Sequence, residues 1–592
     1  MNIIGIHDGH NASVAAIQNG RVIAACQEER LSRLKNQGGT PVKALEETLR
    51  LSGIDSFDQV DKVVVAGRIS QPPYITRTDV LEDYANMSRF SKSWLGGLRA
   101  FSADNRVFRN ARTLFQIKRK MDQTQSLRSA SLAKAGVPLE KITFVDHHTA
   151  HASSAYYGLA NYNDQILVLT NDGAGDGICA TVNIGHGGRL QRICYVTEDN
   201  SVATIYAMVT YMMGMVPLEH EYKIMGLAPY YRGPIDQNPV YQGLLEIFEW
   251  DSQNPLLWRR SAGMPRVGYL WRYLDKLLKI ERFDTIAAGL QAFIESLLVE
   301  WVGRCIRETG LSRLAVSGGT FMNVKVNQAI LSLPEVDELF VFPSCGDETN
   351  SVGSAYWYYA EQRLCTNQMV DIDALGSIYW GGEFHDSDIA SILHKYNFNS
   401  DSVRWEKYDD VEGKVAELLA KEQIVARFKG RMEFGARALG NRSILANASQ
   451  PNVVQYINDI IKSRDFWMPF APSVLSDCST DYFHKPISVK ASYMVMSFDT
   501  VQNNRDSIIA AVHPQDGTAR PQEVYPGDNP EYESLLRKFH IITGNGAILN
   551  TSFNLHGYPL VYSPVDALKV FDVSGLEYLA LGNFLVSKCE DS

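Results

Sequence analysis

The chain of 592 residues is longer than one hydrophobic core usually supports, so two or more domains are expected. Hydrophobic residues make up 45% and charged residues 21%, a globular composition that excludes a fibrous or disordered chain. The formal net charge of -10 opposes nucleic acid as the main partner, because the overall field repels phosphates.

The cysteines and the N-terminus indicate a reducing compartment. The eight cysteines are scattered and include no Cys-x-x-Cys pair, so neither a thiolate zinc site nor a disulfide framework is indicated. The opening MNIIGIHDGHNAS lacks the basic start and long apolar run of a signal peptide. No uninterrupted apolar stretch reaches the roughly 20 residues that span a bilayer. We therefore expect a cytoplasmic protein that binds no membrane.

The first half of the chain is expected to consist of strands that end in polar or glycine-rich turns. Residues 2–7 predict a buried strand, and the alternation at 13–18 and 21–26 predicts a hairpin around Asn19-Gly20. Further strands are expected at 142–145 and 166–171, and residues 314–320 and 338–347 are each expected to be a strand followed by a polar turn. Helices are expected over 104–136, 285–308 and 350–362. No internal sequence repeat is visible. Ligands in open α/β sheets bind at the carboxyl ends of strands, so these turns are the candidate sites.

A second α/β domain is expected after a weakly periodic, glycine-containing segment at 363–385. We divide the chain into residues 1–365 and 366–592. In the second part, helices are expected at 410–421 and 452–462, and strands at 424–430, 493–500, 547–553 and 578–587.

Two histidines and two aspartates form a candidate metal site. His147 and His151 are four residues apart at an expected helix start, which places both imidazoles on one helical face. Asp172 and Asp347 each follow a strand and offer hard oxygen ligands. Such a donor set suits Fe(II), Mn(II) or Zn(II) better than calcium. The alternative is a histidine pair that caps the helix and satisfies buried polar groups.

The other turns of the first half carry candidate substrate and nucleotide residues. Asp8 and His10 lie on a tight loop where an imidazole could accept the proton of a hydroxyl, although Asp8 could equally bond backbone amides. Gly318, Gly319 and Asn323 follow a strand and begin a helix, an arrangement that attracts phosphate or ribose oxygens or is only a tight turn. Lys223 could line a cleft or belong to a solvated loop.

A basic cluster in the second half predicts a phosphate-binding pocket. Residues 427–464 hold seven basic side chains and only two acidic ones, interleaved with glycines that let a ligand approach the backbone. The apolar run FWMPFAP favours a walled pocket over a solvated basic face. The candidate ligand-binding residues are Arg437, Arg442, Lys462, Arg464, Arg520, Ser552 and Asn554.

Ten motifs in this order resemble one family along nearly the whole chain. They are GHNAS, EERLSRLKNQGG, DHHTAHASSAYY, NDGAGDG, EYKIMGLAPY, SGGTFMNVKVN, MEFGARALGNRSIL, KSRDFWMPFAP, HPQDGTARPQ and NTSFNLHGYP. Together they resemble the NodU/CmcH-type O-carbamoyltransferases.

The resemblance implies an α/β protein with two domains. The first, residues 1–365, would be an ASKHA domain (actin-like ATPase, similar to the transferase TsaD) that carries the metal and transfers the carbamoyl group. The second, residues 366–592, would be a YrdC-like domain that makes carbamoyl-adenylate from carbamoyl phosphate and ATP. The implied cofactors are Fe(II), or another divalent transition metal, and Mg²⁺ with ATP. The acceptor would be the hydroxyl of a small molecule, such as a natural product.

The resemblance also assigns roles to residues. His147, His151, Asp172 and Asp347 match the metal ligands, with Asp176 in the same turn as an alternative to Asp172. His10 matches the base, with Asp8 beside it. Lys462 and Arg520 match catalytic residues of adenylate formation, and Arg437, Ser552 and Asn554 match residues that handle the phosphates and the carbamoyl group. The basic segment 85–136 matches no family motif, so the acceptor stays unassigned.

Three other functions fit parts of the sequence. A threonylcarbamoyl transferase acting on tRNA would have the same two fold types, but the acidic charge argues against it. A sugar-kinase-like phosphotransferase would leave the second basic pocket unexplained. A nucleotide-binding scaffold would bind ATP without turnover. No nucleic acid is expected as a partner, and a homodimer is left open.

Overall fold

The structure is a computed structural model that describes residues 1–69, 74–92, 110–400, 402–486 and 488–588. It contains two compact units. Unit 1 comprises Met1–Glu28 and Asn36–Leu375, and unit 2 comprises Glu29–Lys35 and Gly376–Ser592. The junction at 375/376 lies inside the segment expected to separate two domains, whereas the short segment 29–35 was expected in the first domain.

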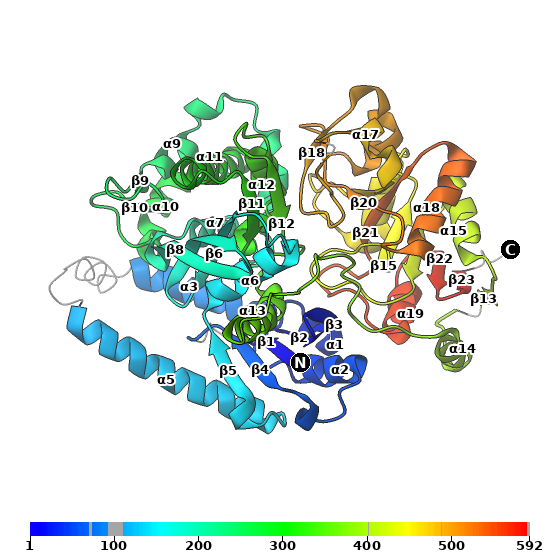
Figure 1. The fold of residues 1–592 in the computed structure, drawn as a ribbon. Helices are drawn as coiled ribbons and strands as arrows, with labels where there is room; N and C mark the ends of the chain where they lie inside the picture. The colour runs from blue at the N-terminus through cyan, green and yellow to red at the C-terminus, as the bar shows by residue number, and fades with distance from the viewer. Residues whose placement is uncertain (70–73, 93–109, 401, 487, 589–592) are drawn as a thin grey trace. The chain divides into compact units, whose positions relative to one another are not determined.

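Unit 1 contains two sheets with the same topology (Figure 1). The first has the order β3-β2-β1-β4-β5 and the second the order β8-β7-β6-β11-β12. In each sheet the three strands that come first in the chain are antiparallel neighbours. The other two strands run parallel to the first of these, which is β1 in one sheet and β6 in the other. The strands are β1 (Asn2–His7), β2 (Ser13–Gln18), β3 (Arg21–Gln27), β4 (Lys62–Ala66), β5 (Ile142–Val145), β6 (Ile166–Gly175), β7 (Ile178–His186), β8 (Arg189–Thr197), β11 (Arg313–Ser317) and β12 (Glu338–Val341).

This duplicated order is the arrangement expected of an ASKHA domain. The duplication is one of topology, and the sequence does not show it because topology requires the same succession of buried strands and turns, not the same residues. The expected opening strand and hairpin are confirmed, with Asn19 and Gly20 both at positive φ.

Two helices cross between the sheets of unit 1. Helix α6 (His147–Leu159) follows β5 of the first sheet but packs on β6 and β11 of the second, and α13 (Asn350–Cys365) follows β12 but packs on β1 and β4. The two helices also pack on each other, and a Cβ atom at Gly353 would lie 1.9 Å from Ala150 O. Glycine is therefore required at this crossing. Each helix thus follows a strand of one sheet and packs on the other sheet, so the polar turns at the ends of the two sheets lie close together.

Unit 1 contains nine further helices among the described residues. They are α2 (Val42–Ser52), α3 (Arg77–Lys92), α5 (Asn110–Lys134), α7 (Val202–Met212), α8 (Glu221–Leu227), α9 (Pro239–Leu245), α10 (Trp271–Leu278), α11 (Phe283–Thr309) and α12 (Val324–Leu331), and a small β9–β10 hairpin spans Phe248–Trp250 and Trp258–Arg260. The short helix α1 (Glu28–Ser32) begins at the last residue before the segment 29–35 of unit 2. The helix expected over 104–136 is α5; residues 104–109 lie outside the described residues. Within the described chain, α11 is long and apolar enough to cross a membrane, but 67% of its apolar window is buried inside the protein.

Unit 2 is built on one eight-stranded mixed sheet of order β13-β23-β22-β14-β15-β21-β16-β20. Its strands are β13 (Val403–Lys407), β14 (Val425–Phe428), β15 (Arg442–Ala446), β16 (Ala471–Leu475), β20 (Gln522–Val524), β21 (Ala547–Ser552), β22 (Tyr578–Leu581) and β23 (Phe584–Lys588). The helices are α14 (Asp386–Lys395), α15 (Val411–Ala420), α16 (Asn452–Ile457), α17 (Ser479–Tyr482), α18 (Pro530–Thr543) and α19 (Pro564–Val573). A small sheet comprises β17 (Phe483–His484), β18 (Phe498–Thr500) and β19 (Thr518–Ala519).

Two expected strands of unit 2 differ in the structure. The single strand expected at 578–587 is the hairpin β22–β23, because Gly582 adopts φ +59° and reverses the chain. The strand expected at 493–500 is shortened to β18, since Met494 has φ +56° and interrupts the extended backbone.

Candidate functional site

The first candidate residues lie where α6 begins after β5. Asp146 caps the helix by accepting a hydrogen bond from Thr149 N at 2.9 Å. His147 and His151 lie one turn apart and are both buried. A Cβ atom at Gly175 would lie 2.2 Å from the His147 ring, so β6 requires glycine there to admit the imidazole.

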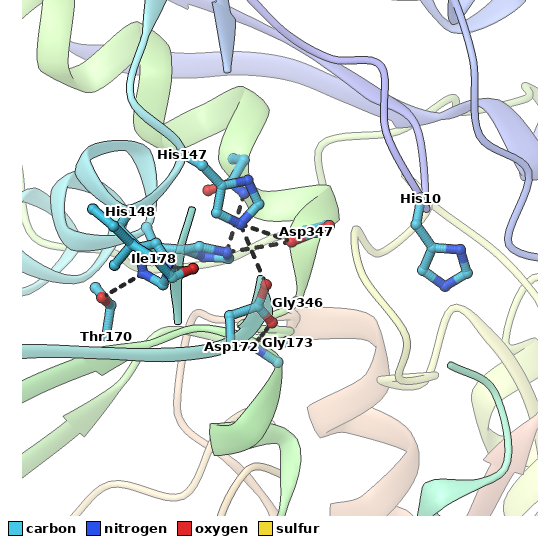
Figure 2. Close-up of polar contacts among 12 residues, drawn as sticks. His10, His147, His148, Thr170, Asp172, Gly173, Ile178, Gly346 and Asp347 are labelled. Atoms are coloured by element: carbon cyan, nitrogen blue, oxygen red, sulfur yellow. Dashed lines mark hydrogen bonds and ion pairs between the residues drawn. The ribbon is translucent and has the colours of Figure 1, made fainter. Parts of the chain in front are cut away.

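Two carboxylates complete a cluster around these imidazoles (Figure 2). His147 Nε2 lies 3.3 Å from Asp172 Oδ2 and 3.4 Å from Asp347 Oδ1. His151 Nε2 lies 3.3 Å from Asp347 Oδ1, and the four ligand atoms all lie within 4.8 Å of one another. Ligands of a first-row divalent ion lie about 2.0–2.2 Å from it, so opposite ligands are roughly 4 Å apart. A modest contraction of the cluster would fit one such ion.

The imidazoles and the carboxylates of the cluster stabilise each other's charged forms. Burial by itself lowers the pKa of His147, but the carboxylates of Asp347 and Asp172 outweigh it and raise this pKa to about 9. Burial opposes ionisation of Asp347 too, but the neighbouring imidazoles hold the pKa of its carboxyl well below the usual range. Two carboxylates therefore favour positive charge at this point. A divalent cation would supply that charge with both imidazoles neutral.

Asp176, the alternative to Asp172, points to backbone amides. Its carboxylate accepts hydrogen bonds from Arg68 N at 2.9 Å, Ile69 N at 2.6 Å and His147 N at 2.8 Å. It thus fixes the loop after β4 against the start of α6. Asp172 instead directs Oδ2 at His147, so the geometry favours Asp172 as the ligand.

His148 lies beside the cluster but is fully bonded elsewhere. Its Nδ1 lies 2.8 Å from Thr170 Oγ1 and its Nε2 lies 3.0 Å from Ile178 O (Figure 2). Because a carbonyl oxygen only accepts, Nε2 carries the proton and Nδ1 accepts from the threonine. Burial lowers the pKa of His148 to about 3, so the ring stays neutral. The residue therefore braces α6 against β6 and β7.

A further histidine, His7 at the end of β1, reaches the cluster and was not identified from the sequence. Its Nε2 lies 3.0 Å from His10 O and 3.5 Å from Asp347 Oδ2. Both oxygens are acceptors, so Nε2 carries the proton and holds the opening loop toward Asp347. Its position at the carboxyl end of a strand, directly before Asp8, was the only signal in the sequence.

The two candidates on the opening loop have different surroundings. The carboxylate of Asp8 is bound by Arg128 of α5, with Nε to Oδ2 at 2.9 Å and Nη2 to Oδ1 at 2.5 Å. Arg128 also donates to Gly67 O and to the carbonyl of the residue before it. His10 Nε2 lies 3.3 Å from Leu218 O, and the ring stands apart from the four-residue cluster (Figure 2). Asp8 is thus a structural anchor of the opening loop.

We expect Arg128→Met to destabilise unit 1 strongly. Both partners of the ion pair are buried, so the substitution leaves the carboxylate of Asp8 without its guanidinium, at about 3–5 kcal/mol. Thermal and denaturant unfolding would measure the loss. Arg50→Met, which breaks an ion pair of a 62% exposed arginine with Glu47, is the matched control and should change stability by at most about 1 kcal/mol. Equal stability of the two variants would contradict a structural role for the pair.

The other candidates of unit 1 lie on neighbouring turns. Gly318 has φ +110°, and Gly319 N donates to Asp172 Oδ1 at 2.9 Å, so this turn holds the candidate metal ligand. Asn323 caps α12 through Lys325 N and Val326 N.

Lys223 lies on α8, one turn from its start. Two residues earlier, Glu221 accepts from Leu218 N at 2.7 Å, and burial raises its pKa to about 7. Glu221 therefore shapes the loop whose carbonyl contacts His10.

Unit 2 gathers the second candidate set around Lys462. The lysine ends a π-helical turn, and Ser463 beyond it has φ +44°. Lys462 Nζ donates to Ser552 O, to Ser552 Oγ at 3.1 Å and to Asn554 Oδ1 at 2.6 Å. All three residues were predicted from the sequence to belong to one pocket, and the chain at the end of β21 brings Ser552 and Asn554 to the lysine.

Three arginines add positive charge to this region. Burial, together with the charges of Arg437 and Arg464, holds the pKa of Arg520 well below its usual range. Burial and Arg464 likewise lower the pKa of Lys462. These side chains lie close enough to repel one another, and a bound polyanion would relieve that repulsion. The geometry can therefore hold phosphate groups.

Arg442, grouped with the ligand-binding arginines in the sequence analysis, instead has structural contacts. It is fully buried in β15, and its guanidinium lies 3.7 Å from the Phe428 ring centroid. The guanidinium donates to Lys429 O at 3.1 Å, to Gly430 O at 3.2 Å and to Gly382 O at 3.1 Å. Its donors are therefore directed at backbone carbonyls of unit 2.

Known proteins match this chain in both halves. The sequence profile of the carbamoyltransferase N-terminus matches residues 2–356, and that of the carbamoyltransferase C-terminus matches residues 416–588. The nodulation protein NolNO of Sinorhizobium fredii is 28% identical over 98% of this chain and 79% of its own length. Nodulation protein U of Bradyrhizobium diazoefficiens is 30% identical over 47% of this chain and 46% of its own. Full-length HypF in the phosphate- and nucleotide-bound form is 13% identical over 61% of this chain and 55% of its own, with a TM-score of 0.34.

The protein defined by this fold and these matches is a carbamoyltransferase, an enzyme that moves a carbamoyl group. The chain belongs to the carbamoyltransferase family, and its nodulation-protein relatives confirm the resemblance to NodU/CmcH-type enzymes.

Proposed function

We propose that the chain makes carbamoyl-adenylate in unit 2 and transfers its carbamoyl group to a small-molecule hydroxyl in unit 1. The observation that carries the first step is the Lys462 cluster, where a buried ammonium is aimed by Ser552 and Asn554 beside three arginines. Carbamoyl phosphate and ATP both bring phosphate groups that such a cluster binds.

Conservation of atoms defines the products of the first step. A carbamate oxygen must attack the α-phosphorus of ATP, which releases pyrophosphate and leaves carbamoyl-AMP. The carbamate arises when water cleaves carbamoyl phosphate to inorganic phosphate. One phosphate and one pyrophosphate are therefore released for each carbamoyl-AMP. Lys462 and Arg520 would stabilise the charge on the departing phosphates.

His10 is the group that we assign to the second step. If Nε2 donates to Leu218 O, the lone pair is on Nδ1, which can accept the hydroxyl proton as the oxygen attacks the carbamoyl carbon. AMP then leaves with the electron pair of the broken carbon–oxygen bond. Asp8 supports this step indirectly, since its bond to Arg128 fixes the loop.

The metal would be held by His147, His151, Asp172 and Asp347. Two imidazoles and two carboxylates suit Fe(II), Mn(II) or Zn(II), and we propose Fe(II) on the family resemblance. Such an ion would supply Lewis-acid stabilisation of negative charge. Ser317 Oγ, 3.2 Å from His151 Nδ1, would orient that ligand's ring.

The first half-reaction tests this proposal without an acceptor. Purified protein with ATP, Mg²⁺ and carbamoyl phosphate should release phosphate and pyrophosphate in equal amounts and form a species with the mass of carbamoyl-AMP. Release should stop when carbamoyl phosphate is left out. ADP as the product, or no turnover, would reject the adenylate mechanism. A positive result would then justify screening sugars and other alcohols for carbamoylation.

A further inference from the structure

The segment Glu29–Lys35 belongs to unit 2, although it lies near the N-terminus of the chain. It lies within the motif EERLSRLKNQGG at 28–39, to which neither candidate site assigns a role. The chain enters unit 2 at Glu29, leaves it after Lys35, and enters it again at Gly376. Unit 2 is therefore assembled from two distant parts of the sequence.

Apolar and polar contacts anchor this segment within unit 2. Leu31 packs against the buried cluster of Met432, Ala438, Leu560 and Tyr562. Arg33 donates from Nη1 to Leu560 O at 2.5 Å and from Nη2 to Pro559 O at 2.9 Å, and its Nε lies 3.8 Å from Asp566 Oδ1. The segment thus packs on the chain that follows Ser552 and Asn554.

Arg30 binds the loop that carries Arg437. Its Nη2 donates to Gly435 O at 2.7 Å, and its Nη1 lies 2.5 Å from Glu29 Oε1, with both side chains buried. Gly435 is two residues before Arg437 and has φ +97°.

The far end of the same loop is held by Glu433. Its Oε1 accepts from Leu439 N at 2.7 Å and from Arg442 N at 3.2 Å. Arg30 and Glu433 thus hold the Arg437 loop at different points, Arg30 at Gly435 and Glu433 at Leu439 and Arg442.

Lys35 ends the segment close to Lys462. Its positive charge is among the causes, after burial and Arg464, that lower the pKa of Lys462. This proximity agrees with the anchors, since Arg33, two residues earlier, binds the backbone at 559–560, a few residues beyond Asn554. A lysine from the N-terminal part of the chain therefore lies within electrostatic reach of the proposed adenylate site.

We propose that Lys35 is a further anion-binding residue of this site, and that Arg30 is a positioning residue for the Arg437 loop. The ligand class is a di- or triphosphate, bound by the ammonium of Lys35 together with Lys462. The inference rests on the proposed function for the identity of the reaction, but the anion site itself does not depend on turnover.

The test uses the full-length chain and inorganic pyrophosphate as the probe. A charge-assisted hydrogen bond contributes enough that Lys35→Met should weaken pyrophosphate binding, measured by calorimetry, by about 10- to 100-fold. Lys35→Arg, which keeps the charge, should regain most of the affinity. Lys43→Met removes an exposed lysine on α2 and is the matched control, with unchanged affinity expected.

Turnover supplies the second readout. In carbamoyl-phosphate-dependent pyrophosphate release, Lys35→Met should raise KM for a phosphate substrate by a similar factor, while Arg30→Lys should lower kcat more than it raises KM. Unchanged pyrophosphate affinity and unchanged KM in Lys35→Met would overturn the inference. If the wild type bound pyrophosphate but did not turn over carbamoyl phosphate, the proposed reaction would fail, and a Lys35-dependent affinity would still support the anion site.

Discussion

Lys462→Ala is expected to lower the rate of carbamoyl-AMP formation by about 1000-fold, measured as pyrophosphate release. The substitution removes the buried ammonium that donates hydrogen bonds to Ser552 and Asn554 and lies within electrostatic reach of Arg464. Burial and the charge of Arg464 lower the pKa of Lys462, so a bound anion would stabilise its ammonium form. Phosphate and pyrophosphate release, followed together, would measure the loss.

Two variants separate this role from stability. Lys421→Ala removes an exposed lysine of the same unit and should leave turnover unchanged. Lys462→Arg keeps the positive charge, but the planar guanidinium cannot reproduce the ammonium contacts, so little activity should return. The assignment would be wrong if Lys462→Ala folded normally and formed carbamoyl-AMP at the wild-type rate.

His151→Ala should separate the two half-reactions. The variant loses one imidazole of the cluster, and we expect metal affinity to fall on the order of 100-fold or more. Carbamoyl transfer to any accepting alcohol should be lost with the metal. Pyrophosphate release should stay near the wild-type rate, because the proposed adenylate site is formed by residues of unit 2.

Metal content after anaerobic loading with Fe(II) measures this prediction before an acceptor is known. Asp176→Asn is the matched control, because Asp176 binds three backbone amides and not the imidazoles, so metal content should persist. Loss of pyrophosphate release in His151→Ala would refute the division of labour between the units. Retention of metal in that variant would refute the assignment of His151 as a ligand.

The local sequence determined much of the fold and the membership of the candidate sites. Alternation and Asn19-Gly20 predicted the opening hairpin because these signals act between adjacent residues. The four-residue spacing of His147 and His151 places both on one face of any helix. Motif order identified the family and pointed to Lys462, Ser552 and Asn554 as one group, which the structure brings together.

Local signals misled where a turn was overlooked. Gly582 reverses the chain inside what was expected to be one strand, and Met494 interrupts another. The duplicated sheet of unit 1 also escaped sequence inspection, since equal topology needs no equal residues. The apolar patterns correctly indicated extended segments. The backbone conformation at Gly582 and Met494 decided where those strands end, and the pairing of distant strands decided the topology of unit 1.

Only the tertiary structure decided which polar side chains point where. The sequence could not separate Asp172 from Asp176, because the turn sends one carboxylate to the imidazoles and the other to amides of a distant loop. It could not show that Asp8 binds Arg128, 120 residues away. Nor could it place Lys35 in unit 2. Such contacts join residues far apart in the chain, and neither periodicity nor spacing records them, whereas helix faces, turns and motifs are determined by neighbours in the sequence.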